Sequence, residues 1–348
     1  MKTLATGWAT HCLPVQIPRF WSQATTRAPT PDTSRRRKIG VHRWGWSDTS
    51  QVEASAHAGV RLAQAVEALS RGERVRYREK RHAYDAGDGV PIREEIVLTQ
   101  GAVVITRNLY GALCLNTPRV MFIDLDDEPV RLPTTQGAKE GLLAMLGLAI
   151  TSAALAIAGA TADLYGPPLA LAPLGFLAVG QWCRRHWLKA QPLPRDVLWQ
   201  RVAEFAAEYG GLHLRVYETP AGLRVLVMNG TLSPCGDLCA RMFEDLGADP
   251  HYVRMCRLQR CFRARVSPKP WRIERFAPAR PPREVWPLEG AALAQREAWV
   301  AAYNRASEGY AACRFARTYG APQVSPEALE VQLLHDQMCR ALEPLPLA

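Results

Sequence analysis

The chain has 348 residues, of which 43 are basic, 33 are acidic and 48% are apolar, and its formal net charge is +10. This composition excludes a disordered or collagen-like protein, and the length allows one large domain or two smaller ones. The positive charge is concentrated in residues 1–40 and 254–283, which leaves the rest of the chain mildly acidic. A charge localised in this way argues against a protein that wraps nucleic acid.

Residues 1–40 are rich in Ser, Thr, Pro and Arg and contain no apolar core of a signal peptide. We expect a disordered basic N-terminal extension there, although its low acid content is also typical of a transit peptide. A helix is predicted to follow from Ser50, because Glu53 completes a capping box and apolar residues recur at helical spacing until Gly72.

Strands are predicted next in residues 41–138, which we interpret as a cytosolic α+β part. The β-branched runs 95–99 and 102–106 flank a Gln-Gly turn and predict a hairpin. Residues 119–126 form an apolar strand that ends in acids.

Two uncharged apolar segments, 141–160 and 164–183, predict a transmembrane helical hairpin within residues 139–189. A helix of about 20 residues matches the thickness of the hydrocarbon layer. Basic residues flank the pair while its turn carries only Asp163, so the positive-inside rule predicts a multi-pass protein of the bacterial inner membrane. Both termini would be cytoplasmic and the lipid bilayer would be a partner. A buried helical hairpin in a globular protein is the alternative.

The remaining elements complete a recognisable order. They are predicted as a helix over 196–209, strands over 213–218 and 223–228, a helix over 233–246, a strand over 261–266, and C-terminal helices over 291–319 and 325–342. From residue 119 to 266 the order is strand, helix, strand, strand, helix, strand, which is the split βαβ or ferredoxin-like pattern. We therefore predict an α+β fold in which residues 41–138 and 190–290 form one ferredoxin-like cytosolic domain, interrupted by the transmembrane hairpin and followed by helices in 291–348.

Three carboxylates are predicted to meet at one end of this sheet. Asp124 and Asp126 lie two residues apart on one strand face, and Glu218 lies beside the turn of the second hairpin. Such oxygens suit Mg²⁺ or Mn²⁺ bound against a triphosphate. An ordinary boundary between a strand and a loop is the alternative.

A basic stripe is the second candidate site. Its predicted phosphate-binding residues are Arg254, Arg257, Arg263, Arg265, Lys269 and Arg272. Guanidinium groups suit the phosphate of a nucleotide or of an anionic lipid headgroup. A solvated charged face is the alternative.

The nine cysteines are scattered and odd in number, which favours a reducing compartment over a disulfide framework. Cys235, Cys239, Cys256 and Cys261, with His251 between them, do not have the tight spacing of a zinc knuckle, so buried thiols are the favoured interpretation. Cys114 and Cys313 have no nearby partner pattern.

Two resemblances add to this interpretation. Residues 45–50, 88–95, 105–126 and 261–272 resemble an uncharacterised family of bacterial membrane-associated hypothetical proteins, which implies a topology and no activity. Residues 122–126 (FIDLD) also resemble the first motif of archaeo-eukaryotic-type primases, whose RRM-like core begins with an apolar strand that ends in Asp-x-Asp. That group usually has a histidine after a glycine turn, where this chain has Arg224, and no third catalytic acid is evident here.

Two functions follow as hypotheses. The first is a membrane-anchored cytosolic domain that binds a phosphate-bearing ligand, with a divalent-metal-dependent nucleotide site between the acidic strand end and the basic stripe. The second is a non-catalytic membrane scaffold whose basic stripe binds anionic lipid or a protein partner. The sequence assigns no catalytic residues.

Overall fold

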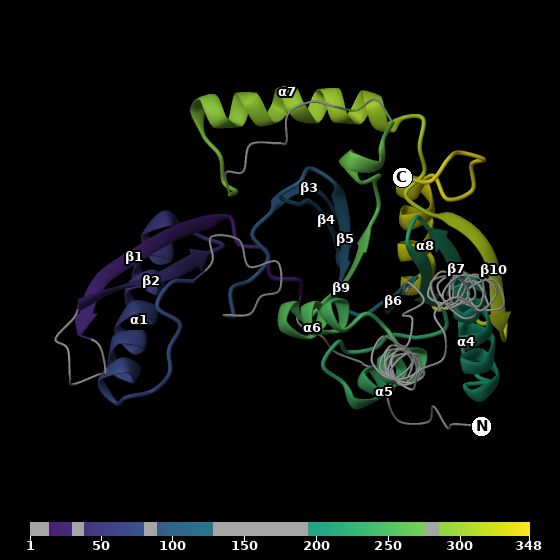
Figure 1. Cartoon of the computed structure of the whole chain (residues 1–348), viewed down its shortest axis with the longest axis horizontal. Coiled ribbons are helices and arrows are strands. Elements are labelled where there is room, and N and C mark those ends of the chain that lie inside the picture. Colours follow the sequence, from purple (N-terminus) through teal and green to yellow (C-terminus); the bar gives the residue numbers. More distant parts are fainter. Residues whose placement is uncertain (1–13, 30–37, 80–88, 128–193, 275, 277–284) are drawn as a thin grey trace, which may run out of the picture. The chain divides into compact units, whose positions relative to one another are not determined.

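The computed structural model describes residues 14–29, 38–79, 89–127, 194–274, 276 and 285–348 (Figure 1). The chain divides into two compact units, one formed by Met1–Asp126 with Arg201–Ala348 and the other by Asp127–Gln200. The described part of the first unit is α+β and contains three antiparallel sheets.

The first sheet is a hairpin of β1 (Phe20–Pro29) and β2 (Lys38–Ser47) against which α1 (Gln51–Ser70) packs (Figure 1). The predicted cap is confirmed, because the Ser50 side chain accepts a hydrogen bond from the backbone N–H of Glu53. The prediction of disorder over residues 1–40 is wrong for the strand β1. Its local composition is that of a flexible tail, but pairing with β2 satisfies its backbone and buries Trp21.

The second sheet has the order β3 (Glu95–Gln100), β4 (Val103–Arg107), β5 (Leu113–Thr117) and β9 (Phe262–Arg265). The hairpin predicted over residues 95–106 is confirmed as β3 and β4. All three pairs of neighbours are antiparallel, and β9 pairs with β5 across a large separation in sequence.

The third sheet has the order β10 (Arg314–Gly320), β7 (His213–Thr219), β8 (Gly222–Val227) and β6 (Phe122–Asp126). Since β8 is antiparallel to both β6 and β7, these two strands are parallel to each other, and α4 (Pro194–Glu208) lies between them in the chain.

The ferredoxin-like prediction is corrected at the fourth strand of this sheet. That pattern requires residues 261–266 to lie beside β6, but β9 belongs to the second sheet, and β10 fills the fourth position beside β7. Residues 314–320 were expected to be helical, so the C-terminal region also departs from the prediction of helices alone. The pattern of apolar residues sets the inner face of a strand but not the strand with which it pairs.

The two faces of the third sheet differ in chemistry. One face is aliphatic, with residues such as Ile123, Val216 and Val225 completely buried. The other carries Tyr217 and Arg224 and contacts α8 (Pro326–Cys339), which lies alongside the sheet (Figure 1). The described ranges also contain the helices α5 (Asp237–Leu246), α6 (Pro250–Gln259) and α7 (Gly290–Ser307).

The prediction of a transmembrane hairpin is corrected. None of the helices in the described ranges is long and apolar enough to cross a bilayer. The two predicted spans, 141–160 and 164–183, lie outside the described residues. The inner-membrane location is withdrawn on this finding, and the lipid bilayer as a partner stays a prediction. Length and lack of charge, on which the prediction depended, are also properties of buried helices in globular proteins.

Candidate functional site

Asp124 is engaged by an arginine rather than left open for a metal ion. The register of β6 and β8 places Asp124 opposite Arg224. Nε of Arg224 donates to Oδ1 of Asp124 at 2.7 Å, and Nη2 donates to Oδ2 at 3.0 Å. Burial opposes the charge on Arg224, whose side chain is only 2% exposed, but the Asp124 carboxylate raises its pKa above the ordinary value. Both oxygens of Asp124 are therefore already used.

The three predicted metal ligands do not converge. Glu218 follows Tyr217 on β7, and since Tyr217 pairs with Arg224, Glu218 lies on the face opposite to Asp124. It is also two strands away, or about 10 Å. Asp126 shares the face of Asp124, and burial, Asp124 and Asp249 together raise its pKa.

The predicted phosphate-binding residues separate into three groups. Arg254 and Arg257 line an open groove of about 600 Å³ between α5 and α6. Arg263 turns inward, where it donates to Glu94 at 2.6 Å, and both side chains of this pair are almost completely buried. The remaining three, Arg265, Lys269 and Arg272, act electrostatically on one another. We refer to Arg265, Lys269 and Arg272 as the cation cluster.

The cation cluster is built from the end of β9 and the short helix Pro270–Arg272. Partial burial and the positive charges of Arg265 and Arg272 lower the pKa of Lys269 to about 8. Burial and Arg265 likewise lower the pKa of Arg272. Asp126 acts on both Lys269 and Arg272, and Asp124 also acts on Lys269. Since Asp124 is paired with Arg224, positive charge still exceeds negative charge here.

Two nitrogens of the cation cluster lack hydrogen-bond partners. Nε of Arg265 and Nη1 of Arg272 are inaccessible to solvent and donate to no acceptor. Trp271 directly precedes Arg272 and is 62% exposed, and its ring lies 5.1 Å from the ring of Tyr110 and 5.6 Å from Nζ of Lys269. Unsatisfied buried donors in a native protein call for an acceptor, and an anion supplies one.

A second group of functional side chains lies at α8. Cys313 comes directly before β10, and His335 and Cys339 are one turn apart on α8. Nε2 of His335 lies 3.9 Å from Sγ of Cys313 and 3.5 Å from Sγ of Cys339. The three ligand atoms lie within 4.8 Å of one another and are buried, so this Cys/His/Cys group could hold a metal ion.

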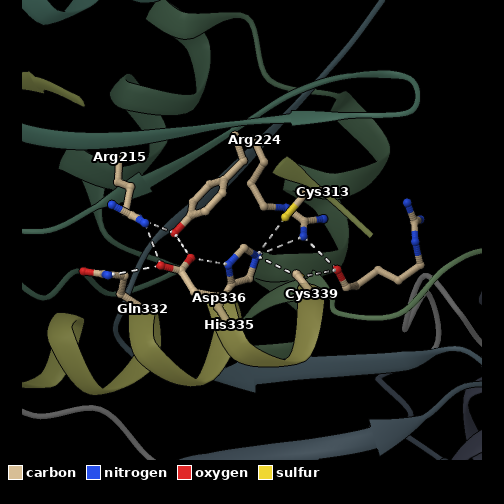
Figure 2. Close-up of polar contacts among 9 residues, drawn as sticks. Arg215, Arg224, Cys313, Gln332, His335, Asp336 and Cys339 are labelled. Atoms are coloured by element: carbon tan, nitrogen blue, oxygen red, sulfur yellow. Dashed lines mark hydrogen bonds and ion pairs between the residues drawn. The ribbon is translucent and has the colours of Figure 1, made fainter. Parts of the chain in front are cut away.

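Polar residues surround the imidazole on both sides. Figure 2 shows Asp336 on one side of His335, with Cys313, Cys339 and Arg224 on the other. Oδ1 of Asp336 lies 3.6 Å from Nδ1 of His335 and accepts a hydrogen bond from Tyr217 at 2.7 Å. Arg215 and Gln332 also donate to Asp336, which fixes its carboxylate.

The thiol and imidazole of this group shift each other's pKa. Burial opposes the thiolate, but a hydrogen bond from Cys339 and the nearby His335 lower the pKa of Cys313 well below its ordinary value. Burial opposes the imidazolium, but Cys313 and Asp336 raise the pKa of His335. Cys313 and His335 are completely buried, so a substrate cannot reach the thiol as it would have to reach a catalytic nucleophile.

Sequence reasoning missed the Cys/His/Cys group and considered other cysteines. Burial raises the pKa of Cys239 and of Cys261 to about 12, as is typical of buried thiols. Within the described ranges, Cys313, His335 and Cys339 are the one such ligand cluster. The His335-x₃-Cys339 spacing, which places both side chains on one helix face, was the available signal, but nothing local indicates Cys313.

No family model matches this chain, and neither a curated protein nor a solved structure is significantly similar to it. The resemblances to a bacterial membrane-associated family and to the primase core therefore stay predictions.

Proposed function

We propose that the protein binds a phosphate-bearing ligand at the cation cluster of Arg265, Lys269 and Arg272. The observation that carries this proposal is the pair of buried guanidinium nitrogens, one on Arg265 and one on Arg272, that have no acceptor. Leaving such a donor unsatisfied costs about 1–3 kcal/mol. Phosphate oxygens are acceptors that match the guanidinium fork.

The composition of the cluster favours a nucleotide with more than one phosphate. Three basic side chains gather beside Asp126 and Asp124, and Asp124 is already paired with Arg224, so a polyanion gains more than a monoanion does. The exposed ring of Trp271 is available for stacking on a base beside the phosphates.

Mg²⁺ or Mn²⁺ would enter this site with the phosphates. Arg224 occupies Asp124, and Glu218 lies on the opposite face, so Asp126 is the member of the predicted ligand set that is left for a metal ion. Mg²⁺ commonly binds through one or two carboxylates, with phosphate oxygens and waters completing its shell. Asp126→Asn should therefore weaken the binding of ATP in Mg²⁺ but not without Mg²⁺, because without the metal ion it only removes a negative charge beside Lys269 and Arg272.

The hypothesis of a membrane scaffold is less well supported by the positions of the basic residues. It requires a continuous basic stripe, but Arg263 is buried in an ion pair with Glu94. Arg254 and Arg257 belong to a separate groove. A soluble ligand at the cation cluster is therefore preferred over an extended lipid surface.

Titration calorimetry with pyrophosphate, ATP and adenosine tests the proposal. Arg272→Gln should reduce the affinity for pyrophosphate about tenfold or more, since charge-assisted hydrogen bonds contribute about 1.5–3 kcal/mol. Arg254→Gln is the matched control, because Arg254 is exposed on α6, and it should change the affinity less than twofold.

Three results would contradict the proposal. One is a folded protein that binds neither pyrophosphate nor ATP. Another is an equal loss in Arg272→Gln and Arg254→Gln. The third is salt-sensitive binding to anionic lipid vesicles without any binding of soluble phosphates, which would restore the scaffold hypothesis.

A further inference from the structure

We propose that Cys313, His335 and Cys339 bind one structural Zn²⁺ ion that joins the start of β10 to α8. The distances fit this ion. Tetrahedral zinc with bonds of about 2.3 Å to sulfur and about 2.0–2.1 Å to nitrogen places those atoms about 3.5 Å apart. The observed separations from Nε2 of His335 are 3.5 Å to Cys339 and 3.9 Å to Cys313.

The donor set selects the class of metal. Two thiols and an imidazole are soft or borderline ligands, which favour zinc over Mg²⁺ or Mn²⁺. Binding releases two protons from the Cys313, His335 and Cys339 group, which leaves two thiolates and a neutral imidazole around the ion. The resulting centre is neutral, and the neighbouring Arg224 and Asp124 already neutralise each other, so no net charge is buried.

The surroundings of His335 are those of a metal ligand. Its Nδ1 faces Asp336 at 3.6 Å, is inaccessible to solvent and has no hydrogen-bond partner. A proton held there by Asp336 leaves the lone pair of Nε2 for the ion, as in carboxylate–histidine–zinc arrangements, and the ion would replace Nη1 of Arg224, which lies 3.3 Å from that nitrogen. Arg215 and Tyr217 hold Asp336 in this position (Figure 2).

Burial makes the ion structural rather than catalytic. Cys313 and His335 are 0% exposed and Cys339 is 1% exposed, so substrate has no access to an open coordination position. The backbone oxygen of Arg265 lies 3.8 Å from Sγ of Cys339, so the end of β9 contacts one of the three ligands. The ion would therefore link the start of β10 to α8, with the end of β9 in contact with its ligand Cys339.

Metal analysis of the full-length protein, purified without chelators, tests the proposal. We expect one zinc per chain. Replacement by Co²⁺ should give the visible bands of tetrahedral cobalt and an absorption from sulfur-to-cobalt charge transfer. Cys339→Ser should lose the zinc, while Cys261→Ser should keep it, because Cys261 is an equally buried thiol in a different cluster.

A positioning variant covers the case in which Cys339→Ser does not fold. Asp336→Asn keeps the shape of the side chain and should lower the zinc affinity about 10–100-fold. A competition with a chelator measures this affinity. Wild-type protein that is folded yet binds neither zinc nor cobalt would overturn the proposal. So would a mass two hydrogen atoms lower than that of the reduced chain, with Cys313 and Cys339 oxidised to a disulfide, or equal zinc loss in Cys261→Ser and Cys339→Ser.

Discussion

At the residue scale, Arg224 connects the two groups of functional side chains. It binds both oxygens of Asp124, donates to the backbone oxygen of Arg265 at 2.8 Å and lies 3.3 Å from Nε2 of His335. An arginine so deeply buried is stable only while its partners are present. Asp124 thus neutralises an internal cation, which is a different role from the metal ligation that its sequence position indicated.

Removing this arginine should be costly. Arg224→Ala should lower the free energy of unfolding by about 3 kcal/mol, because Asp124 then lacks its partner and a cavity is left. Urea denaturation measures the change, and Arg254→Ala on exposed α6 should stay within about 0.5 kcal/mol of wild type. In a cycle with Asp124→Ala, the two changes should couple by about 1 kcal/mol or more. Additive changes would show that the ion pair contributes little.

Lys269 predicts a pH dependence for phosphate binding. Burial, Arg265 and Arg272 lower its pKa in the folded protein to about 8, below the ordinary value. Its charged form, which attracts phosphate, is therefore lost as the pH rises through about 8, and the affinity for pyrophosphate should fall between about pH 8 and 10. The folding stability should change in the opposite direction to the affinity. Between about pH 8 and 10 the Lys269 side chain binds more protons in the unfolded chain than in the folded one, so its contribution to folding stability becomes more favourable as pH rises.

A conservative variant separates Lys269 from other titrating groups. Lys269→Arg keeps the charge across this pH range and should flatten the decrease in affinity, as measured by calorimetry at pH 7, 8, 9 and 10. An unchanged decrease in Lys269→Arg would assign the pH dependence to another group.

At the element scale, the close approach of β2 to α1 depends on one glycine. A Cβ at Gly45 would lie 2.1 Å from the backbone nitrogen of Ala58 and 2.3 Å from the backbone oxygen of Ala54. Neither backbone atom can move without shifting the helix, so the hairpin and α1 pack only with glycine at this position.

Two alanine variants test this packing. Gly45→Ala should destabilise the protein by about 2 kcal/mol or more, because the helix is pushed off the hairpin. Gly59→Ala, on the open side of α1 with no atom within 4 Å of its Cβ, should instead stabilise it by about 0.5–1 kcal/mol through helix propensity. Thermal or urea unfolding measures both. Equal effects would contradict this account of the packing.

Local signals predicted elements well but did not predict their partners. The cap at Ser50, the hairpin of β3 and β4 and the hairpin of β7 and β8 follow from residues a few positions apart. The pairing of β9 with β5 and of β10 with β7 joins segments about a hundred residues or more apart, and alternation in one strand does not encode such a partner.

The candidate site shows the same division between local and distant information. Asp124 and Asp126 could be placed on one strand face from their spacing, but the sequence does not reveal that Arg224 occupies Asp124. Of the six predicted phosphate-binding residues, three form the cation cluster. The others lie elsewhere because of contacts that the sequence does not reveal, such as the ion pair of Arg263 with Glu94.

At the scale of the whole first unit, Arg265 belongs to both proposed sites. Its side chain is part of the cation cluster, while its backbone oxygen accepts from Arg224 and lies near Cys339. A zinc ion at Cys313, His335 and Cys339 would hold the end of β9 in place. Arg265 would then already be partly ordered before a phosphate binds, so phosphate binding would cost less conformational entropy. The two ligands should therefore bind cooperatively.

Linkage makes this coupling measurable from both sides. Zinc-loaded protein should bind pyrophosphate about 5–10-fold more tightly than chelator-treated protein, and saturating pyrophosphate should raise the zinc affinity by the same factor. Calorimetry gives the first factor and a chelator competition the second. Arg272→Gln, which acts at the cation cluster alone, should abolish the effect of pyrophosphate on zinc while leaving the zinc stoichiometry at one. If both ligands bind with affinities that are independent of each other, Arg265 does not couple the sites, and the two proposals then hold or fail separately.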